Sequence, residues 1–487
     1  MSQRTLRGAF HTHLASPMRG RDAAELARGA TPLELFFDLV VVVAVALAAE
    51  RLHHAIVERV GLASLLSYAL VFLAIWLAWV NFTWFASAYD TDDVVYRLGV
   101  LVIMTGALVL AAGVPLVFDQ RDFRLVVTGY VIMRLALVTQ WIRVAIDDAP
   151  RRGAALRFAV GVTACQVGWL SLVVVPQLWP LAWGVLLPIE LLIPAWAERA
   201  ARTPFHPEHI TERYGLFMII VLWRVGPGGV PRHTERPGNW RDYVRARGGD
   251  ITGSLLIVYS MWWIYFDRPE EHLLESVPTA IAWSYLHLPI FAAAAAVGAG
   301  LVVAIEESAG HYHLGWVAVG AAVAAPVLVY LLSLWALYVR VLRACSTGSS
   351  SRSCRLSSSP RSFTPAPVLV IGLLLAGVVV VKVAYRVRDA VRAEIGALGV
   401  FTRWATCQSG LRRKDVEPMQ AGAEYLVILN DRQLREGQIR QHQQAARSKR
   451  PSRTTHAHAV TMQVAQLLSA TRGSLSRFTR RTRSSPA

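Results

Sequence analysis

Long apolar stretches, each close to the length of a membrane-spanning helix, follow one another along this chain. The first, residues 32–50, reads PLELFFDLVVVVAVALAAE. A helix that crosses a bilayer needs about 20 mostly apolar residues. The repeated pattern therefore predicts an all-α, polytopic integral membrane bundle with ten or eleven transmembrane helices. The expected spans cover residues 32–50, 62–84, 98–118, 125–142, 155–175, 181–196, 209–222, 251–267, 280–305, 316–337 and 367–385.

Composition agrees with this pattern. Of the 487 residues 54% are hydrophobic and only 17% are charged, which is too apolar for an ordinary soluble protein. The net charge of +17 is unevenly placed, because residues 341–487 hold 24 Lys+Arg against 7 Asp+Glu. We expect residues 344–366 to form a Ser/Arg-rich linker and residues 386–487 a basic, disordered tail. Contact of this tail with anionic lipid or nucleic acid is the alternative to a solvated tail.

Arginine placement orients the chain. Residues 1–31 form a basic N-terminal arm, and arginines recur after the fourth and sixth expected spans. The positive-inside rule then predicts a cytoplasmic N-terminus. Aromatic residues near the end of the second span are expected at a membrane interface. They are Trp76, Trp79, Trp84 and Tyr89.

Two carboxylates in the first span are the leading candidates for function. Glu34 and Asp38 are four residues apart, so they share one helix face. A charged carboxylate facing lipid is costly, so the pair should face the bundle interior, where it could bind a proton or cation. The alternative is that both lie solvated at the membrane edge, near a helix N-terminus that favours anions.

Other polar residues extend this candidate intramembrane site. Arg134 is the only arginine that the pattern places deep in a span, and a buried arginine needs a partner. Glu34, Asp38 or Glu190 could be that partner, in a structural ion pair or in transport. His287 lies on an apolar face, where it is either a structural histidine or a proton relay.

Two motifs raise the question of a metal site. His209 and Glu212 have a spacing that can bind metal, but no second ligand set lies nearby, so helix capping and interfacial charge are the simpler interpretation. Asp90, Asp92 and Asp93 resemble the start of a calcium loop without its glycine and terminal glutamate, so we expect a solvated acidic turn. We expect no metal and no other cofactor.

Five motifs, in order, give the chain a family resemblance. They are LELFFDLV from residue 33, YDTDDVVYR from 89, HITERYGLFMIIVL from 209, WWIYFD from 262 and WSYLHLP from 283. Residues 32–343 resemble the bacterial low temperature requirement protein A family. The resemblance implies a multi-pass protein of the bacterial inner membrane that is tied to growth at low temperature, and it implies no known reaction.

The resemblance fails at Trp223. Family members are similar to VLGE here, followed by more apolar helix, whereas this chain continues with a Gly/Pro/Arg-rich run to about residue 250. We interpret residues 223–250 as an out-of-frame stretch of the gene. A genuine re-entrant or extracellular loop is the alternative.

Three functions fit these residues. The leading hypothesis is a membrane protein that moves a small solute or proton, with the carboxylates as coupling groups. A lipid-modifying membrane enzyme and a non-catalytic scaffold are the alternatives. The chain has no GxSxG, HExxH or P-loop motif, so we expect no enzyme. The expected partners are the lipid bilayer and a small solute or ion.

Overall fold

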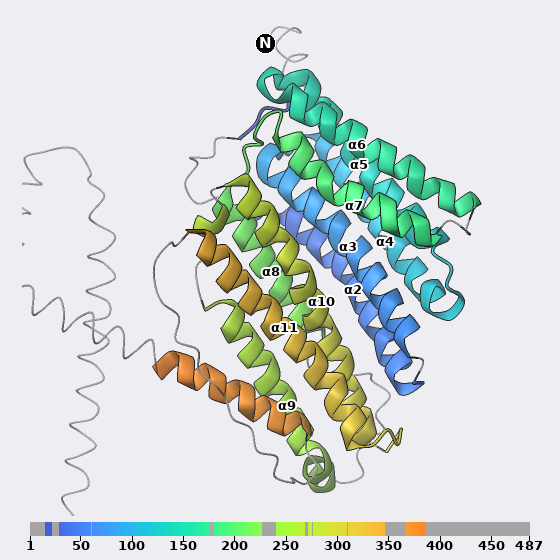
Figure 1. Ribbon diagram of the computed structural model, residues 1–487, viewed down its shortest axis with the longest axis vertical. Helices are drawn as coiled ribbons and strands as arrows, with labels where there is room; N and C mark the ends of the chain where they lie inside the picture. The colour runs from blue at the N-terminus through green and yellow to red at the C-terminus, as the bar shows by residue number, and fades with distance from the viewer. Residues whose placement is uncertain are drawn as a thin grey trace, which may run out of the picture. The chain divides into compact units, whose positions relative to one another are not determined.

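Helices make up almost all of the chain that the structure describes (Figure 1). The computed structural model describes residues 15–21, 29–59, 61–175, 177, 179–225, 240–267, 271–274, 276–308, 310–345 and 367–384. These residues contain no strand, so the all-α expectation is confirmed. The helices are α2 (Pro32–Val57), α3 (Leu62–Tyr89), α4 (Val94–Gln120), α5 (Arg124–Asp147), α6 (Arg152–Val174), α7 (Trp179–Glu198), α8 (Pro207–Val225), α9 (Trp240–Tyr265), α10 (Val277–Ser308), α11 (Trp316–Cys345) and a last helix, Pro367–Ala384.

Eight of the described helical stretches are long and apolar enough to cross a membrane. They comprise α2 to α6, α10, the Trp316–Tyr338 part of α11 and the last helix. The expected number of ten or eleven spans is therefore not confirmed. Helices α7, α8 and α9 fall outside this set, and both α8 and α9 carry charged residues in their first halves.

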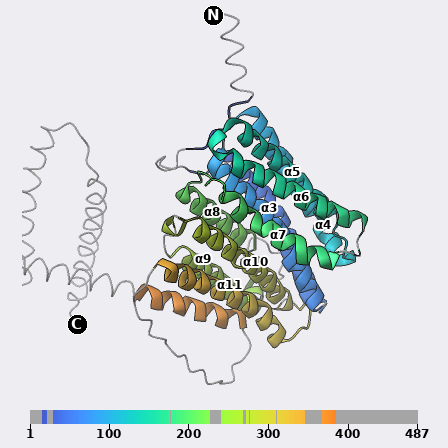
Figure 2. The ribbon, with the colours of Figure 1, turned by 45° about the horizontal axis from the view of Figure 1, so that its top comes forward.

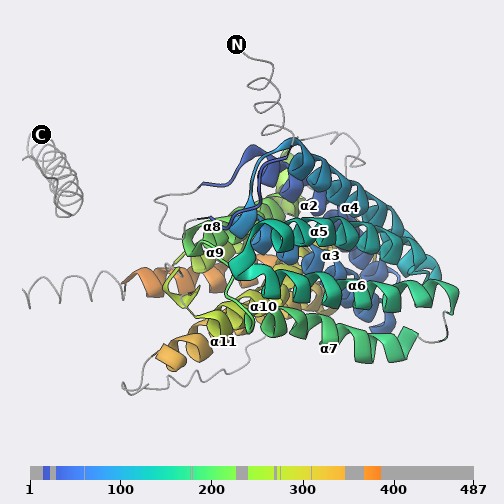
Figure 3. The same ribbon diagram turned by 90° about the horizontal axis from the view of Figure 1, so that it is seen from above.

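The helices form two groups on either side of α2 and α3. Helices α4, α5, α6 and α7 pack in sequence order on one side, and α8, α9, α10 and α11 lie on the other (Figures 1 and 2). Viewed from above, α2 and α3 again lie between these groups (Figure 3). Helix α2 contacts α4 from the first group and both α8 and α10 from the second. Side chains on α2 can therefore join the two groups.

Local sequence signals explain where α2 begins. Thr31 is its N-cap and accepts a hydrogen bond from the Glu34 N–H at 3.3 Å, while the Glu34 carboxylate accepts one from the Thr31 N–H at 2.8 Å. This is a capping box, and Pro32 at the first helical position supports it. The cap anchors the Glu34 carboxylate beside the end of its own helix.

Close helix crossings depend on glycine. A Cβ added to Gly129 on α5 would lie 2.3 Å from the backbone nitrogen of Leu110 on α4, which no side chain permits. A Cβ on Gly253 of α9 would lie 2.6 Å from the nitrogen of Leu369 in the last helix. Lys382 of that helix also pairs with Asp267 at 2.9 Å. The last helix thus packs directly on α9.

Residues 15–21 of the N-terminal arm dock on one end of the bundle. The Ser16 N–H donates to Asp93 at 2.9 Å and the Met18 N–H donates to Asp147 at 2.9 Å. Arg143 donates to Asp93 at 2.6 Å, and the Met18 side chain is buried. The start of α4 and the end of α5 are therefore covered by protein.

Several predictions fall on residues outside the described part of the chain. These are Arg4, Arg7 and Arg28 of the arm, residues 346–366 of the linker and the tail 386–487. Within the atypical stretch 223–250, α8 continues to Val225, residues 226–239 are outside the description, and α9 begins at Trp240. The out-of-frame interpretation stays a prediction.

Candidate functional site

A buried group of four ionisable side chains joins α2 to α8. We call it the α2–α8 ion cluster; it consists of Glu34, Asp38, His209 and Arg213. Arg213 donates two hydrogen bonds to the Asp38 carboxylate, from Nε at 3.1 Å and from Nη2 at 2.6 Å. Its Nη1 lies 3.1 Å from Glu34 Oε1, and His209 Nε2 lies 3.2 Å from Glu34 Oε2. One residue is 1% exposed and the other three are 0% exposed.

Aromatic side chains surround this cluster. Trp79 on α3 donates its indole N–H to Asp38 Oδ1 at 2.8 Å. The Trp79 ring contacts the rings of Tyr214 and Phe217 on α8. Three hydrogen bonds, one from Trp79 and two from Arg213, thus replace the water that the Asp38 carboxylate loses on burial. The alternative of a solvated carboxylate pair at the membrane edge is wrong.

The formal charge of the cluster depends on one proton. Two carboxylates face one guanidinium, so the group carries one net negative charge when His209 is neutral and none when His209 is protonated. Imidazole is the side chain whose charge changes most readily between pH 5 and 8. His209 Nδ1 is buried and has no hydrogen-bond partner within the described residues. The protonation state of His209 therefore sets the formal charge of this cluster between α2 and α8.

A second buried ion pair lies within the first helix group. We call it the α5–α7 ion cluster; its charged members are Arg134 and Glu190, 3.0 Å apart and both almost fully buried. Glu190 accepts further hydrogen bonds from Tyr130 at 2.7 Å, Trp169 at 2.9 Å and Gln166 at 3.4 Å. Of the three partners expected for Arg134, the structure selects Glu190.

Sequence reasoning missed Arg213. Arg134 was the one arginine that the pattern placed deep in a span, but the Arg213 guanidinium, in the second turn of α8, is 0% exposed as well. A usable signal was present: His209 and Arg213 are four residues apart and share a face, as Glu34 and Asp38 do. Matching these two spacings would have suggested the pairing.

The remaining candidates divide between the core and the surface. Glu212 is exposed and lies outside the α2–α8 ion cluster, so the helix does not present it together with His209 as a ligand pair. His287 is fully buried, and its Nδ1 bonds the carbonyl of Trp283 at 2.8 Å. It packs among aromatic rings that include Tyr214 and Phe291. Within the described residues no three His, Cys, Asp or Glu side chains are grouped as a metal site would need.

The acidic turn between α3 and α4 is only partly solvated. Asp92 is exposed and pairs with Arg97 at 2.6 Å, and Asp90 is partly buried. Asp93 is buried and caps α4 by accepting the Tyr96 N–H at 2.7 Å. Burial alone would raise the pKa of Asp93, but the Tyr96 and Ser16 N–H groups and Arg143 outweigh it and hold this pKa below its ordinary value. The expectation of a fully solvated turn is therefore wrong for Asp93, which fastens the N-terminal arm to the bundle.

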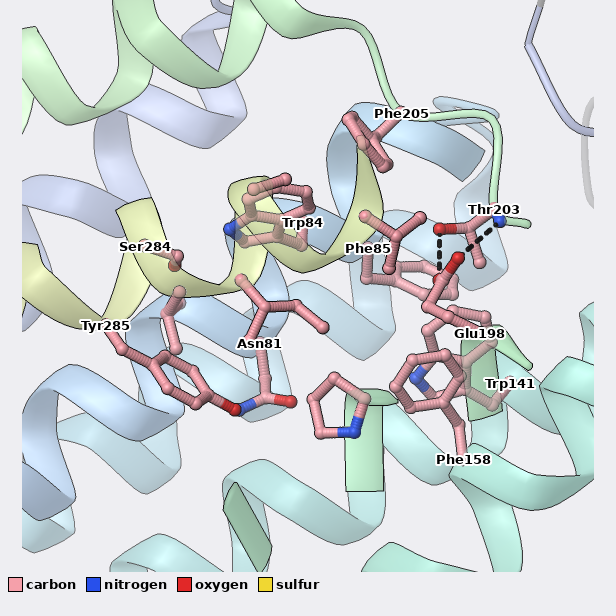
Figure 4. Close-up of a pocket in the computed structure, with 15 residues that line it drawn as sticks. Asn81, Trp84, Phe85, Trp141, Phe158, Glu198, Thr203, Phe205, Ser284 and Tyr285 are labelled. Carbon is pink, nitrogen blue, oxygen red and sulfur yellow. Dashed lines mark hydrogen bonds between the residues drawn. The ribbon is translucent and has the colours of Figure 1, made fainter. Parts of the chain in front are cut away.

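A cavity of about 70 Å³ lies near the α2–α8 ion cluster, between α3, α5, α6, α7 and α10 (Figure 4). Trp84 in its wall donates to the Tyr214 hydroxyl at 3.2 Å, and Tyr214 also shares a hydrogen bond with Ser284, another wall residue. Tyr285 in the wall donates to the carbonyl of Leu191 at 2.6 Å, next to Glu190. Hydrogen bonds and ring contacts thus connect the cavity wall with both ion clusters.

Fold and site together define a class: a multi-pass helical membrane protein with ionised groups buried among its helices. The model of the bacterial low temperature requirement A protein (LtrA) family matches residues 29–388. The chain belongs to this family, and the match includes α2 to α11 and the last helix. Comparison with the curated proteins found no match, and comparison with the solved structures found none either.

Proposed function

We propose that this protein moves protons across the membrane, and that the α2–α8 ion cluster is its coupling centre, where proton binding is coupled to movement of the helices. The main observation in support of this proposal is that two fully buried carboxylates of α2 face one arginine and one histidine of α8. We place the protein in the bacterial inner membrane with its N-terminus in the cytoplasm, on the strength of its arginine distribution.

The charge of the cluster supports coupling. An unbalanced charge in a low-dielectric interior is costly, and a balanced ion group is much less so. A proton on His209 therefore favours the packed contact between α2 and α8, and loss of that proton weakens it. A titratable contact between two packed groups of helices is what an alternating-access carrier needs.

The positions of the helices support the same proposal. Helices α4 and α5 contact the central helices α2 and α3, and α8 and α10 contact them as well. Because α2 contributes both carboxylates and α8 contributes both bases, the cluster spans the boundary between the central helices and the second group. Rocking of one group against the other would break the bonds of Arg213 to Asp38 and of His209 to Glu34.

Proton flux in vesicles tests the proposal. The purified chain is reconstituted with a pH-sensitive dye inside, and a potassium gradient with valinomycin sets the membrane voltage. We expect wild-type flux to exceed that of empty vesicles. His209→Gln, which keeps a polar side chain without the titration, should lower flux by about tenfold or more, equal to about 1.4 kcal/mol on the barrier.

A matched control lies on the same helix. Glu212→Gln also changes one charge of α8, but this residue is exposed and outside the cluster, so its flux should equal wild type. Equal flux in wild type and His209→Gln, or wild-type flux no greater than that of empty vesicles, contradicts the proposal. A non-catalytic scaffold would give this second result.

A further inference from the structure

Six of the fifteen residues that line the cavity of Figure 4 are aromatic. Trp141 and Phe158 stack with centroids 4.3 Å apart, and Phe85 meets Trp141 edge-on at 4.9 Å. Trp84 and Phe205 pack edge-on at 4.7 Å on another side, and Tyr285 completes the ring lining. A water needs about 10–15 Å³ of such space, so a cavity of about 70 Å³ holds several non-hydrogen atoms of a ligand.

One lining residue carries a charge, and that charge is negative. Glu198, at the end of α7, accepts the Thr203 N–H at 3.0 Å and the Thr203 hydroxyl at 2.6 Å. These two bonds use one lone pair on each oxygen, and burial still raises the pKa of the carboxyl group above its ordinary value. The Arg202 guanidinium lowers that pKa in part, but Arg202 is not a lining residue and lies over the Phe205 ring, 5.4 Å from its centroid.

Asn81 adds a polar group to the same wall. Its Nδ2 donates to the Leu77 carbonyl at 2.7 Å, which fixes the orientation of the amide and leaves Oδ1 as an acceptor. The wall thus offers aromatic faces, an amide oxygen and a carboxylate, and no Lys or Arg of the described residues lines it.

We infer that this cavity binds a small alkylammonium cation, with its alkyl groups between the aromatic rings and its charge opposite Glu198. Aromatic faces attract cations most strongly when water is excluded, and rings that enclose a quaternary ammonium group are the usual way in which proteins recognise one. An alkylated cation also loses less hydration than a bare metal ion when it enters an apolar cavity. This binding site is a claim beyond the proposed transport, and it is measured at equilibrium.

The test compares choline with its neutral isostere, 3,3-dimethyl-1-butanol. Both are titrated by calorimetry into the full chain, purified in a maltoside detergent without choline headgroups. We expect choline to bind at least about tenfold more tightly than the alcohol, because only choline gains from the ring faces and the carboxylate. Equal affinity, or no choline binding, overturns the inference.

Two variants locate the site. Glu198→Gln should weaken choline binding about tenfold or more and leave the alcohol unchanged, since it removes the charge and keeps the shape. Glu212→Gln, at an exposed position outside the cavity, should bind choline as wild type does. Unchanged choline affinity in Glu198→Gln overturns the inference.

A pH series on the wild type keeps the test decisive if Glu198→Gln does not fold. Because cation binding needs the ionised carboxylate, choline affinity should fall as the pH falls through the raised pKa of Glu198, while the alcohol should not respond. Choline affinity independent of pH overturns the inference. Titration with a short-chain phosphatidylcholine then tells a lipid headgroup from a free cation as the source of the ammonium group.

Discussion

The two buried ion clusters of this protein differ in charge balance and in position. The α5–α7 cluster has one carboxylate, one arginine and three neutral donors to the carboxylate, all within the first helix group. The α2–α8 cluster has two carboxylates against one arginine and one histidine, and it joins the central helix α2 to the second group.

Under the proposed function, this difference separates a structural role from a coupling role. The α5–α7 cluster is neutral whenever both its charged members are ionised, so it needs no further proton. With both carboxylates ionised, the α2–α8 cluster is neutral only when His209 carries a proton. The proposal therefore assigns the proton-binding role to this cluster, whereas a balanced pair with several donors stabilises one arrangement.

Replacing the arginine of each cluster should give the largest difference in stability between the two clusters. Arg213→Met leaves two carboxylates buried with one imidazole, and we expect a loss of about 3–5 kcal/mol in unfolding free energy. Arg134→Met leaves Glu190 with its bonds from Tyr130, Trp169 and Gln166, so the loss should be smaller, about 1–3 kcal/mol. Thermal unfolding in detergent compares the two. A larger loss for Arg134→Met contradicts the charge-balance argument.

A double-mutant cycle sharpens the assignment of Arg134 to Glu190. Because these side chains are 3.0 Å apart, the double variant Arg134→Met with Glu190→Gln should lose less stability than the two single losses together. The expected coupling is about 1–3 kcal/mol. Additive losses, within the error of the unfolding measurement, would show that the two residues do not act as a pair.

Asp93, whose carboxylate caps the N-terminus of α4, gives a pH-dependent prediction. The folded-state pKa of Asp93 lies below its ordinary value of 3.8, so its contribution is present above pH 3.8 and is lost as the pH falls through the folded-state pKa. Asp93→Asn should lower the unfolding free energy by about 1 kcal/mol at pH 7 and should leave it unchanged once the pH lies below the folded-state pKa of Asp93. Unfolding curves from pH 7 to pH 2 should therefore converge. A constant gap between the curves would contradict the assignment.

The surface pair Arg51–Asp119 should give the smallest effect. Its side chains are 30% and 52% exposed, so solvent screens a contact of 3.1 Å. Asp119→Asn should change the unfolding free energy by less than about 1 kcal/mol and leave proton flux unchanged. This variant is the baseline for the buried substitutions, and a loss as large as that of Arg213→Met would remove the distinction between buried and exposed pairs.

Sequence patterns predicted the helical class and part of the site. Apolar periods of membrane length predicted the bundle, and the cost of a buried arginine predicted an acidic partner for Arg134. Glu190 was one of three possible partners for Arg134, because the sequence of one helix does not say which distant helix Arg134 faces.

Arg213 and Trp79 show why the rest was missed. Arg213 lies in the first half of α8 and Trp79 in the interior of α3, and both side chains turn inward to Asp38. These contacts join residues 175 and 41 positions apart, which no local pattern contains.

Proton flux in vesicles carrying Asp38→Asn, set beside vesicles carrying Glu190→Gln, tests the central claim most directly. Each variant neutralises one buried carboxylate that is bound to one arginine, in the α2–α8 and α5–α7 clusters respectively. The account predicts that Asp38→Asn abolishes voltage-driven flux, while Glu190→Gln keeps it at equal levels of folded protein. Flux that survives in Asp38→Asn and disappears in Glu190→Gln would contradict it.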